Sequence, residues 1–183
     1  VIYIAFGTLV TLESWQARAL VEGLTNDRFR VLWSIPKSHQ HILPNVPPSF
    51  RIESFVPQQA VLSHPSVRVF ISHCGMNSIN EALYYGKPIL ALPFFGDQFY
   101  NAARIIDLGA ALKVNKDNLS SPKVRQQVDL LLNNQSYTDK ANKMSAILKS
   151  TGGRELAANI VESTIAVGIS HLDPELVYEN YNI

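Results

Sequence analysis

The residues best suited to chemistry follow an apolar run in the middle of the chain, in the segment Ser72-His73-Cys74-Gly75-Met76-Asn77-Ser78. The side chains of His73, Asn77 and Ser78 can donate hydrogen bonds, and Gly75 lets a backbone approach a ligand closely. The helix predicted to follow presents unpaired N–H groups and the positive end of its dipole. These groups together suit a phosphate or a diphosphate.

Glu81 extends this segment, because it lies four residues after Asn77 and so on the same face of the helix. A carboxylate there can accept two hydrogen bonds from a ribose diol. A structural explanation is equally open: Ser78 and Glu81 match a capping box, and His73 can be a packed loop histidine. The GxGxxG fingerprint and the P-loop are both absent from the sequence.

Three further groups of polar or aromatic residues follow predicted strands. Phe55 ends a strand, so its ring can stack on a base at the edge of the sheet or pack in the core. Gln58 can bind a hydroxyl group or simply begin a helix. Asp97 and Gln98 suit the vicinal hydroxyls of a sugar, although Asp97 can instead cap the helix that begins there. Each signal is weak when taken alone.

Short apolar runs alternate with helical patterns along most of the chain, which predicts an α/β fold with a parallel sheet and helices on both faces. In such sheets ligands bind beyond the carboxyl ends of the strands. Trp15, Ala19 and Leu20 are expected on one face of an amphipathic first helix. The proline-rich segment 37–49 is expected to be irregular. The predicted strands are 1–6, 31–35, 51–55, 67–71, 89–92 and 110–114, and the predicted helices are 12–24, 57–62, 77–85, 97–108, 121–133, 136–149 and 153–167.

The composition is that of an ordinary globular protein, with 183 residues, 46% of them hydrophobic and 17% charged. The net charge of +1 does not favour nucleic acid or an acidic membrane as a partner. The single cysteine, Cys74, excludes an internal disulfide, and no apolar run is long enough for a transmembrane helix. We expect one domain over residues 1–168 and a C-terminal tail over 169–183. The opening on an apolar strand, with no signal peptide, predicts a fragment cut at a domain boundary.

The candidate residues occur in a distinctive order and spacing, which runs through FVPQ at 55–58, HP at 64–65, FISHCG at 70–75, then Asn77, Ser78 and Glu81, GxP at 86–88, Pro93 and DQxxN at 97–101. This arrangement closely resembles the donor-binding signature of the UDP-dependent glycosyltransferases, the UDP-glucosyl/glucuronosyltransferase family. Segments 5–8 and 31–34 resemble the family's first loop and second strand, so the resemblance covers nearly the whole chain. It implies the C-terminal, Rossmann-like half of a GT-B glycosyltransferase, whose N-terminal acceptor domain is absent here.

The resemblance assigns the nucleoside to residues at one end of the signature. Phe55 matches the residue that stacks on uracil, where the family usually has tryptophan, whose larger ring stacks more strongly. Val56 meets the uracil through its backbone, and Ser34 also touches the base. Gln58 and Glu81 match the ribose contacts.

The diphosphate and the sugar are assigned in the same way. The residues that match the diphosphate contacts are His73, Asn77, Ser78 and the backbone near Gly75, with Thr8 lining the same end. Asp97 and Gln98 match the pair that binds the sugar hydroxyls. Met76 stands where many members have tryptophan beside the sugar, so the identity of the sugar stays open.

The resemblance also implies an inverting transfer of a hexose, glucose being expected, to a small lipophilic acceptor. Fixed donors and a helix N-terminus can stabilise the charge that develops on the diphosphate. The sequence has no Asp-x-Asp pair, so neither a metal nor another cofactor is expected, and the UDP-sugar is a co-substrate. None of the five histidines suits the general base, which the resemblance places in the N-terminal domain. The isolated chain is expected to bind UDP without turnover.

Two other functions fit the same residues. The chain can be the soluble donor-binding subunit of a split glycosyltransferase, or a non-catalytic module that senses nucleotide sugars. The localisation is open between the cytoplasm and, for a membrane-anchored parent, the endoplasmic reticulum. Residues 170–181 faintly resemble the segment before a membrane anchor in some family members, and sequons begin at Asn118 and Asn134.

Overall fold

A computed structural model describes residues 1–168 of the chain, in two units. The first unit is Val1–Ala146, and the second begins at Ile147. All the candidate site residues lie in the first unit. The domain boundary expected at residue 168 stays a prediction, and the expected tail at 169–183 lies outside the described residues. Within residues 1–168, no helix combines the length and apolar character needed to span a bilayer.

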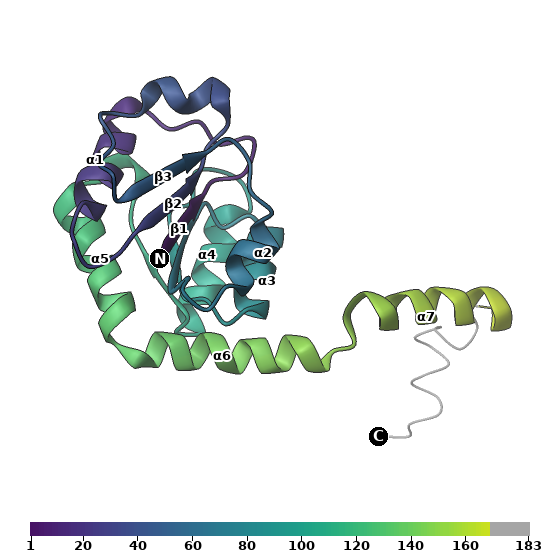
Figure 1. Cartoon of the computed structure of the whole chain (residues 1–183). Coiled ribbons are helices and arrows are strands. Elements are labelled where there is room, and N and C mark those ends of the chain that lie inside the picture. Colours follow the sequence, from purple (N-terminus) through teal and green to yellow (C-terminus); the bar gives the residue numbers. More distant parts are fainter. Residues whose placement is uncertain (169–183) are drawn as a thin grey trace. The chain divides into compact units, whose positions relative to one another are not determined.

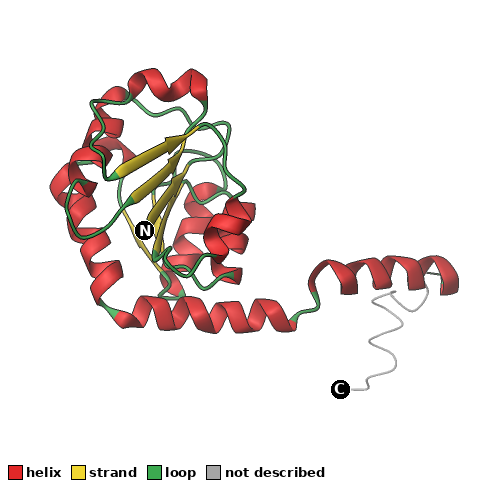
Figure 2. Ribbon diagram, viewed as in Figure 1, coloured by secondary structure: helices red, strands yellow, loops and turns green. Residues whose placement is uncertain are grey.

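The first unit is built around six parallel strands in the order β3-β2-β1-β4-β5-β6 (Figure 2). Their bounds are β1 Ile2–Ala5, β2 Val31–Ser34, β3 Phe50–Glu53, β4 Val69–Ser72, β5 Ile89–Ala91 and β6 Ala111–Lys113. The strand order reverses between β1 and β4, where Ala5 pairs with Ser72. Such a reversal leaves a crevice beyond the carboxyl ends of the two central strands.

Helices cover both faces of this sheet, with α1 and α5 on one side and α2, α3 and α4 on the other (Figure 1). Their bounds are α1 Ser14–Leu24, α2 Gln58–Ser63, α3 Met76–Tyr84, α4 Gln98–Asp107 and α5 Ser121–Asn133. The helix α6, Gln135–Ser150, crosses the boundary between the units, and α7, Gly153–Val167, belongs to the second. The predicted α/β fold class is confirmed.

The strands bury alternate residues on opposite faces of the sheet, as expected for a sheet covered on both sides. On the α1 and α5 face, Ile2, Ile4 and Trp33 pack in a cluster with residues of both helices. On the other face, the rings of Tyr3 and Phe70 stack with their centroids 5.0 Å apart. The Tyr3 hydroxyl on this face donates to Gln58 of the candidate site.

Two details differ from the sequence-based expectations. Ala19 and Leu20 are buried as expected, but Trp15 is 44% exposed, and Ala17 is buried in α1 instead. The segment expected to be irregular contains the 3₁₀ helix η1, Lys37–Ile42, which begins directly after a proline. A second 3₁₀ helix, η2, spans Lys116–Asn118.

Candidate functional site

The candidate residues all lie at or beyond the carboxyl ends of β1 to β5. Gly7 and Thr8 follow β1, Ser34 ends β2, and Phe55 and Val56 follow β3. The segment His73–Gly75 links β4 to α3, and Asp97 with Gln98 links β5 to α4. Because all these strands are parallel, the five connections meet at one edge of the sheet.

A strained turn at Cys74 directs the chain from β4 into α3. Cys74 has φ of +67°, the sole positive φ of a non-glycine residue between positions 1 and 168. Its N–H donates to Ser72 Oγ at 3.1 Å, and its carbonyl accepts from Asn101 Nδ2 at 3.1 Å. Burial raises the pKa of the Cys74 thiol to about 12, so the thiol is neutral. Cys74 therefore shapes the turn and is no nucleophile.

The imidazole of His73 lies against two glycines. A Cβ atom added at Gly7 would come within 3.0 Å of His73 Nε2, and one at Gly75 within 2.6 Å. Gly75 itself has an ordinary φ of −61°. The sequence suggested that a glycine here admits a ligand, and the structure adds that it makes room for the His73 ring.

His73 is largely neutral at pH 7. Burial lowers its pKa below the usual 6.5, and the nearby Ala5 carbonyl and Asp97 carboxylate only partly oppose this effect. Its Nδ1 atom is buried without a well-directed hydrogen bond within the described residues. A neutral imidazole can still donate one N–H to an anion, and an approaching anion would raise its pKa.

The N-terminus of α3 is not closed by a side chain. Gly75 occupies the N-cap position, and among residues 1–168 no side-chain cap bond forms there. The capping-box explanation for Ser78 and Glu81 is therefore wrong, because Ser78 lies within the helix rather than before it. Asn77, in the first turn, is exposed. The first-turn N–H groups thus remain available at the crevice.

A hydrogen-bonded network joins Gln58, at the start of α2, to Glu81 in α3. Gln58 Nε2 donates to Glu81 Oε2 at 2.7 Å and to Ser78 Oγ at 3.3 Å. Gln59 Nε2 donates to the second oxygen of Glu81 at 3.2 Å. The structure therefore brings together the two residues expected at the ribose, and it adds a neighbour, Gln59, that the sequence reasoning did not include.

Tyr3 is a second residue that the sequence reasoning missed. Its buried hydroxyl donates to Gln58 Oε1 at 3.2 Å, which orients the Gln58 amide so that Nε2 faces Glu81. Burial raises the pKa of Tyr3, so the hydroxyl keeps its proton. The available signal was a hydroxyl group within an otherwise apolar strand, since a buried tyrosine usually needs a polar partner.

Asp97 and Gln98 lie side by side but in different environments. Gln98 is 4% exposed, and its Oε1 accepts from the N–H groups of Phe94 at 2.8 Å and Phe95 at 3.2 Å. Asp97 is exposed, and its Oδ2 accepts from Asn101 Nδ2 at 2.8 Å. Asp97 precedes α4 without a side-chain capping bond, so it does not serve as a conventional N-cap.

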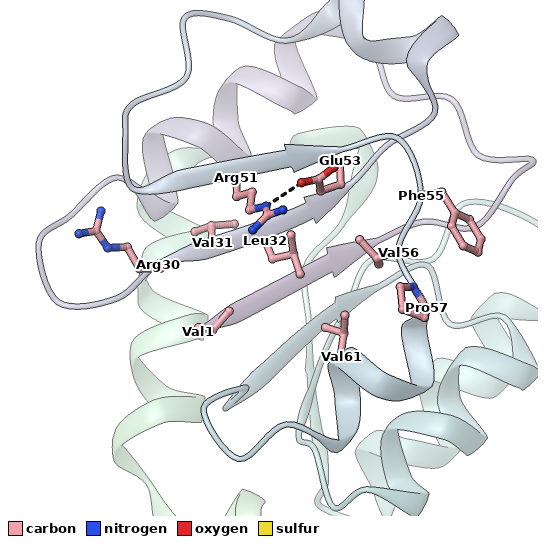
Figure 3. Close-up of a pocket in the computed structure, with 10 residues that line it drawn as sticks. All are labelled: Val1, Arg30, Val31, Leu32, Arg51, Glu53, Phe55, Val56, Pro57 and Val61. Carbon is pink, nitrogen blue, oxygen red and sulfur yellow. Dashed lines mark hydrogen bonds and ion pairs between the residues drawn. The ribbon is translucent and has the colours of Figure 1, made fainter.

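Phe55 stands at one end of an open groove on the α2 side of the sheet (Figure 3). Its ring is 81% exposed, so the alternative of a core phenylalanine is wrong. The groove has a volume of about 490 Å³, and Leu32, Val56 and Val61 contribute apolar lining. Of the candidate residues, only Phe55 and Val56 line it, so the groove is adjacent to the polar crevice and not identical with it.

Comparisons with known proteins agree with this geometry. The profile of the family described as UDP-glucoronosyl and UDP-glucosyl transferase matches residues 1–157. UDP-glycosyltransferase 1 of Phaeomoniella chlamydospora is 36% identical over 90% of this chain and 37% of its own length. Flavonol 3-O-glucosyltransferase of Actinidia chinensis var. chinensis is 33% identical over the whole chain and 38% of its own length. The chain thus spans less than two fifths of either relative.

Solved structures agree with the sequence comparisons. A UDP-glucose: anthocyanidin 3-O-glucosyltransferase in complex with UDP superposes with a TM-score of 0.78 and 30% identity, over 91% of this chain and 40% of that protein. Os79 of O. sativa, also solved with UDP, has a TM-score of 0.82 at 24% identity, over 90% of this chain and 40% of that protein. The fold of this chain is that of the C-terminal half of a GT-B glycosyltransferase. The chain belongs to the UDP-glucuronosyl and UDP-glucosyl transferase family, as a donor-binding C-terminal region.

Proposed function

We propose that this chain binds the UDP-sugar donor of an inverting, metal-independent hexosyltransferase that uses glucose and a small lipophilic acceptor. The observation that carries the proposal is what the strand reversal at β1 and β4 brings to the carboxyl edge of the sheet: the His73 turn, the N-terminus of α3 without a side-chain cap, and the Gln58–Glu81 network. The UDP found in the related anthocyanidin 3-O-glucosyltransferase supports the choice of nucleotide.

The diphosphate binds at the Cys74 turn in this proposal. The first-turn N–H groups of α3 and the side chains of His73, Asn77 and Ser78 donate to its oxygens, with the backbone at Gly75 close by and Thr8 at the same end. When the bond to the sugar breaks, negative charge accumulates on the departing UDP. Donors that are already in place stabilise this charge without reorganisation, so no metal ion is required.

The nucleoside extends from there toward Phe55. The two ribose hydroxyls bind at Glu81 and Gln58, and the exposed Gln59 gives up its bond to Glu81 when the ribose enters. The uracil stacks on the Phe55 ring and contacts the Val56 backbone, with Ser34 beside it. The open position of the Phe55 ring, 81% exposed, supports this assignment because a base can reach it without rearrangement of the core.

The sugar lies at the other end, against Asp97 and Gln98. Because Gln98 Oε1 already accepts two backbone N–H groups, its amide nitrogen is the part that donates to a sugar hydroxyl. Asp97 accepts from another hydroxyl through Oδ1, since Oδ2 is bound to Asn101. The general base that activates the acceptor comes from an N-terminal acceptor domain of the whole protein, so this chain alone does not catalyse transfer.

The proposal is tested by titrating UDP into the 183-residue chain and measuring the heat of binding. We expect saturable binding below millimolar UDP, and a loss of at least about tenfold in affinity for His73→Ala and for Glu81→Ala, since each removes hydrogen bonds to a charged or polar ligand.

Matched controls are His41→Ala and Glu22→Ala, which change exposed residues to which the proposal gives no contact with UDP and should leave UDP binding intact. The absence of binding at millimolar UDP would refute the proposal. Binding that neither His73→Ala nor Glu81→Ala weakens would refute the placement of the nucleotide.

A further inference from the structure

Asn101 is a buried polar residue to which the proposed function gives no role. It is 2% exposed and lies in the first turn of α4, in the DQxxN segment. The donor is assigned to Asp97 and Gln98 in this segment and not to Asn101. A buried carboxamide must nevertheless find partners for its donors, and the partners of Asn101 are informative.

The two donors of Asn101 Nδ2 join two parts of the crevice that are far apart in sequence. One bond goes to Asp97 Oδ2 at 2.8 Å, and the other goes to the carbonyl of Cys74 at 3.1 Å. Asp97 belongs to the β5–α4 connection, whereas Cys74 belongs to the β4–α3 connection. One side chain therefore contacts both the proposed sugar end and the proposed diphosphate end.

Each of the two bonds stabilises its acceptor. Without Asn101, the Asp97 carboxylate would be free to rotate and the Cys74 carbonyl would be buried without a donor. The Asp97 carboxylate is exposed, so without Asn101 it can rotate away from the crevice. A bond to a carboxylate is also stronger than one between neutral groups. The Cys74 carbonyl is buried in a left-handed turn, and losing its donor would leave an unpaired acceptor at a strained position.

We propose that Asn101 is a positioning residue that aims Asp97 Oδ1 at a sugar hydroxyl and holds it in register with the diphosphate turn at Cys74. It touches no part of the donor and acts through Asp97. This inference rests on the proposed function, and it adds the residue that sets the preference for the sugar portion of the donor.

The test is a double-mutant cycle on the 183-residue chain, with UDP and UDP-glucose as the two probes. The measured quantity is the sugar gain, defined as the Kd for UDP divided by the Kd for UDP-glucose. We expect Asp97→Ala and Asn101→Ala each to lower the sugar gain by about tenfold or more, which corresponds to the lower end of the range for one lost hydrogen bond to a charged group. In the double variant the loss should be no larger than in Asp97→Ala alone.

Two further variants separate positioning from general destabilisation. Asn101→Leu keeps about the size of the side chain but has no donors, so it should lower the sugar gain at least as much as Asn101→Ala and serves if the alanine variant does not fold. Gln16→Ala removes a different buried carboxamide. Gln16 lies in α1, and its Nε2 donates to the Lys116 carbonyl at 2.8 Å. This variant should lower the melting temperature and leave the sugar gain unchanged.

A double variant that loses the product of the two single effects would overturn the inference, because Asn101 would then act independently of Asp97. An unchanged sugar gain in both Asn101 variants would overturn it as well. If the wild-type chain binds no UDP, the proposed function fails and the inference fails with it. If the wild-type chain binds UDP but the effects of the two single variants are additive, the inference about Asn101 fails and the proposed function stands.

Discussion

Substituting alanine for Gly75 tests the packing on which the proposed diphosphate site depends. Gly75 has an ordinary φ of −61°, so alanine causes no backbone strain there. Its Cβ atom would lie 2.6 Å from His73 Nε2 and 3.2 Å from Cε1, so the imidazole must move. Forced displacement of a packed side chain costs about 2 kcal/mol, which lowers the melting temperature of a chain of this size by about 4–8 °C.

To test whether the His73 ring causes this cost, the free energy of unfolding is measured in urea without UDP. The effect of Gly75→Ala is compared between the wild-type chain and the His73→Ala chain. The atoms that clash are absent from the His73→Ala chain, so Gly75→Ala should then cost less than about 0.5 kcal/mol. Gly96→Ala is a clash-free control, because no atom lies within 4 Å of the added Cβ and only its φ of +59° opposes the change. An equal cost of Gly75→Ala with and without His73 would show that the ring contact is irrelevant.

Three other predictions concern single side chains of the crevice. Because burial lowers the pKa of His73 below 6.5, the unfolded chain binds this proton at a higher pH than the folded chain does, and the free energy of unfolding should fall as the pH drops below about 6.5. Urea unfolding between about pH 7.5 and about pH 5.5 should show a smaller fall for His73→Gln, and equal slopes would contradict the assignment. Phe55→Trp should tighten UDP binding about two- to tenfold by calorimetry, while the melting temperature stays unchanged because the ring is 81% exposed; weaker binding would exclude stacking at this position. The Cys74 thiol, buried and with a pKa of about 12, should react with N-ethylmaleimide in mass spectrometry only after unfolding in urea, and rapid labelling of the native chain would contradict its burial.

The order of strands and helices could be predicted because apolar periodicity depends only on neighbouring residues. Ile2 and Ile4 in β1, for example, belong to an apolar run too short for a helix. The face of a helix is harder to predict, since several rotations of a short amphipathic helix bury similar numbers of apolar residues. Trp15 is therefore expected on one face with Ala19 and Leu20, although Ala17 is buried beside them instead.

The composition of the candidate site was accessible to sequence reasoning, but its internal contacts were not. The resemblance to the family's donor-binding signature implied that Gln58 and Glu81 belong to one site. The bond from Tyr3 to Gln58 depends on which face of β1 a side chain occupies and on how β1 aligns with α2, neither of which local pattern determines. Likewise, a glycine beside a cysteine suggests that the glycine adopts the left-handed conformation, yet Cys74 adopts it, because Ser72 and Asn101 bind its peptide groups.

The reversal of strand order has a consequence for how the chain folds as it is synthesised. Strands β1, β2 and β3 add in sequence order on one side, while β4, β5 and β6 add on the other. One edge of β1 therefore stays unpaired until β4 is synthesised, since Ile2 pairs with Val69. An apolar strand with an unpaired edge is prone to aggregation. The contact between Gly7 and His73 forms only when these two halves join. The capacity to bind a nucleotide should thus appear abruptly on a ribosome-bound chain, only once β4, its following turn and α3 have left the exit tunnel.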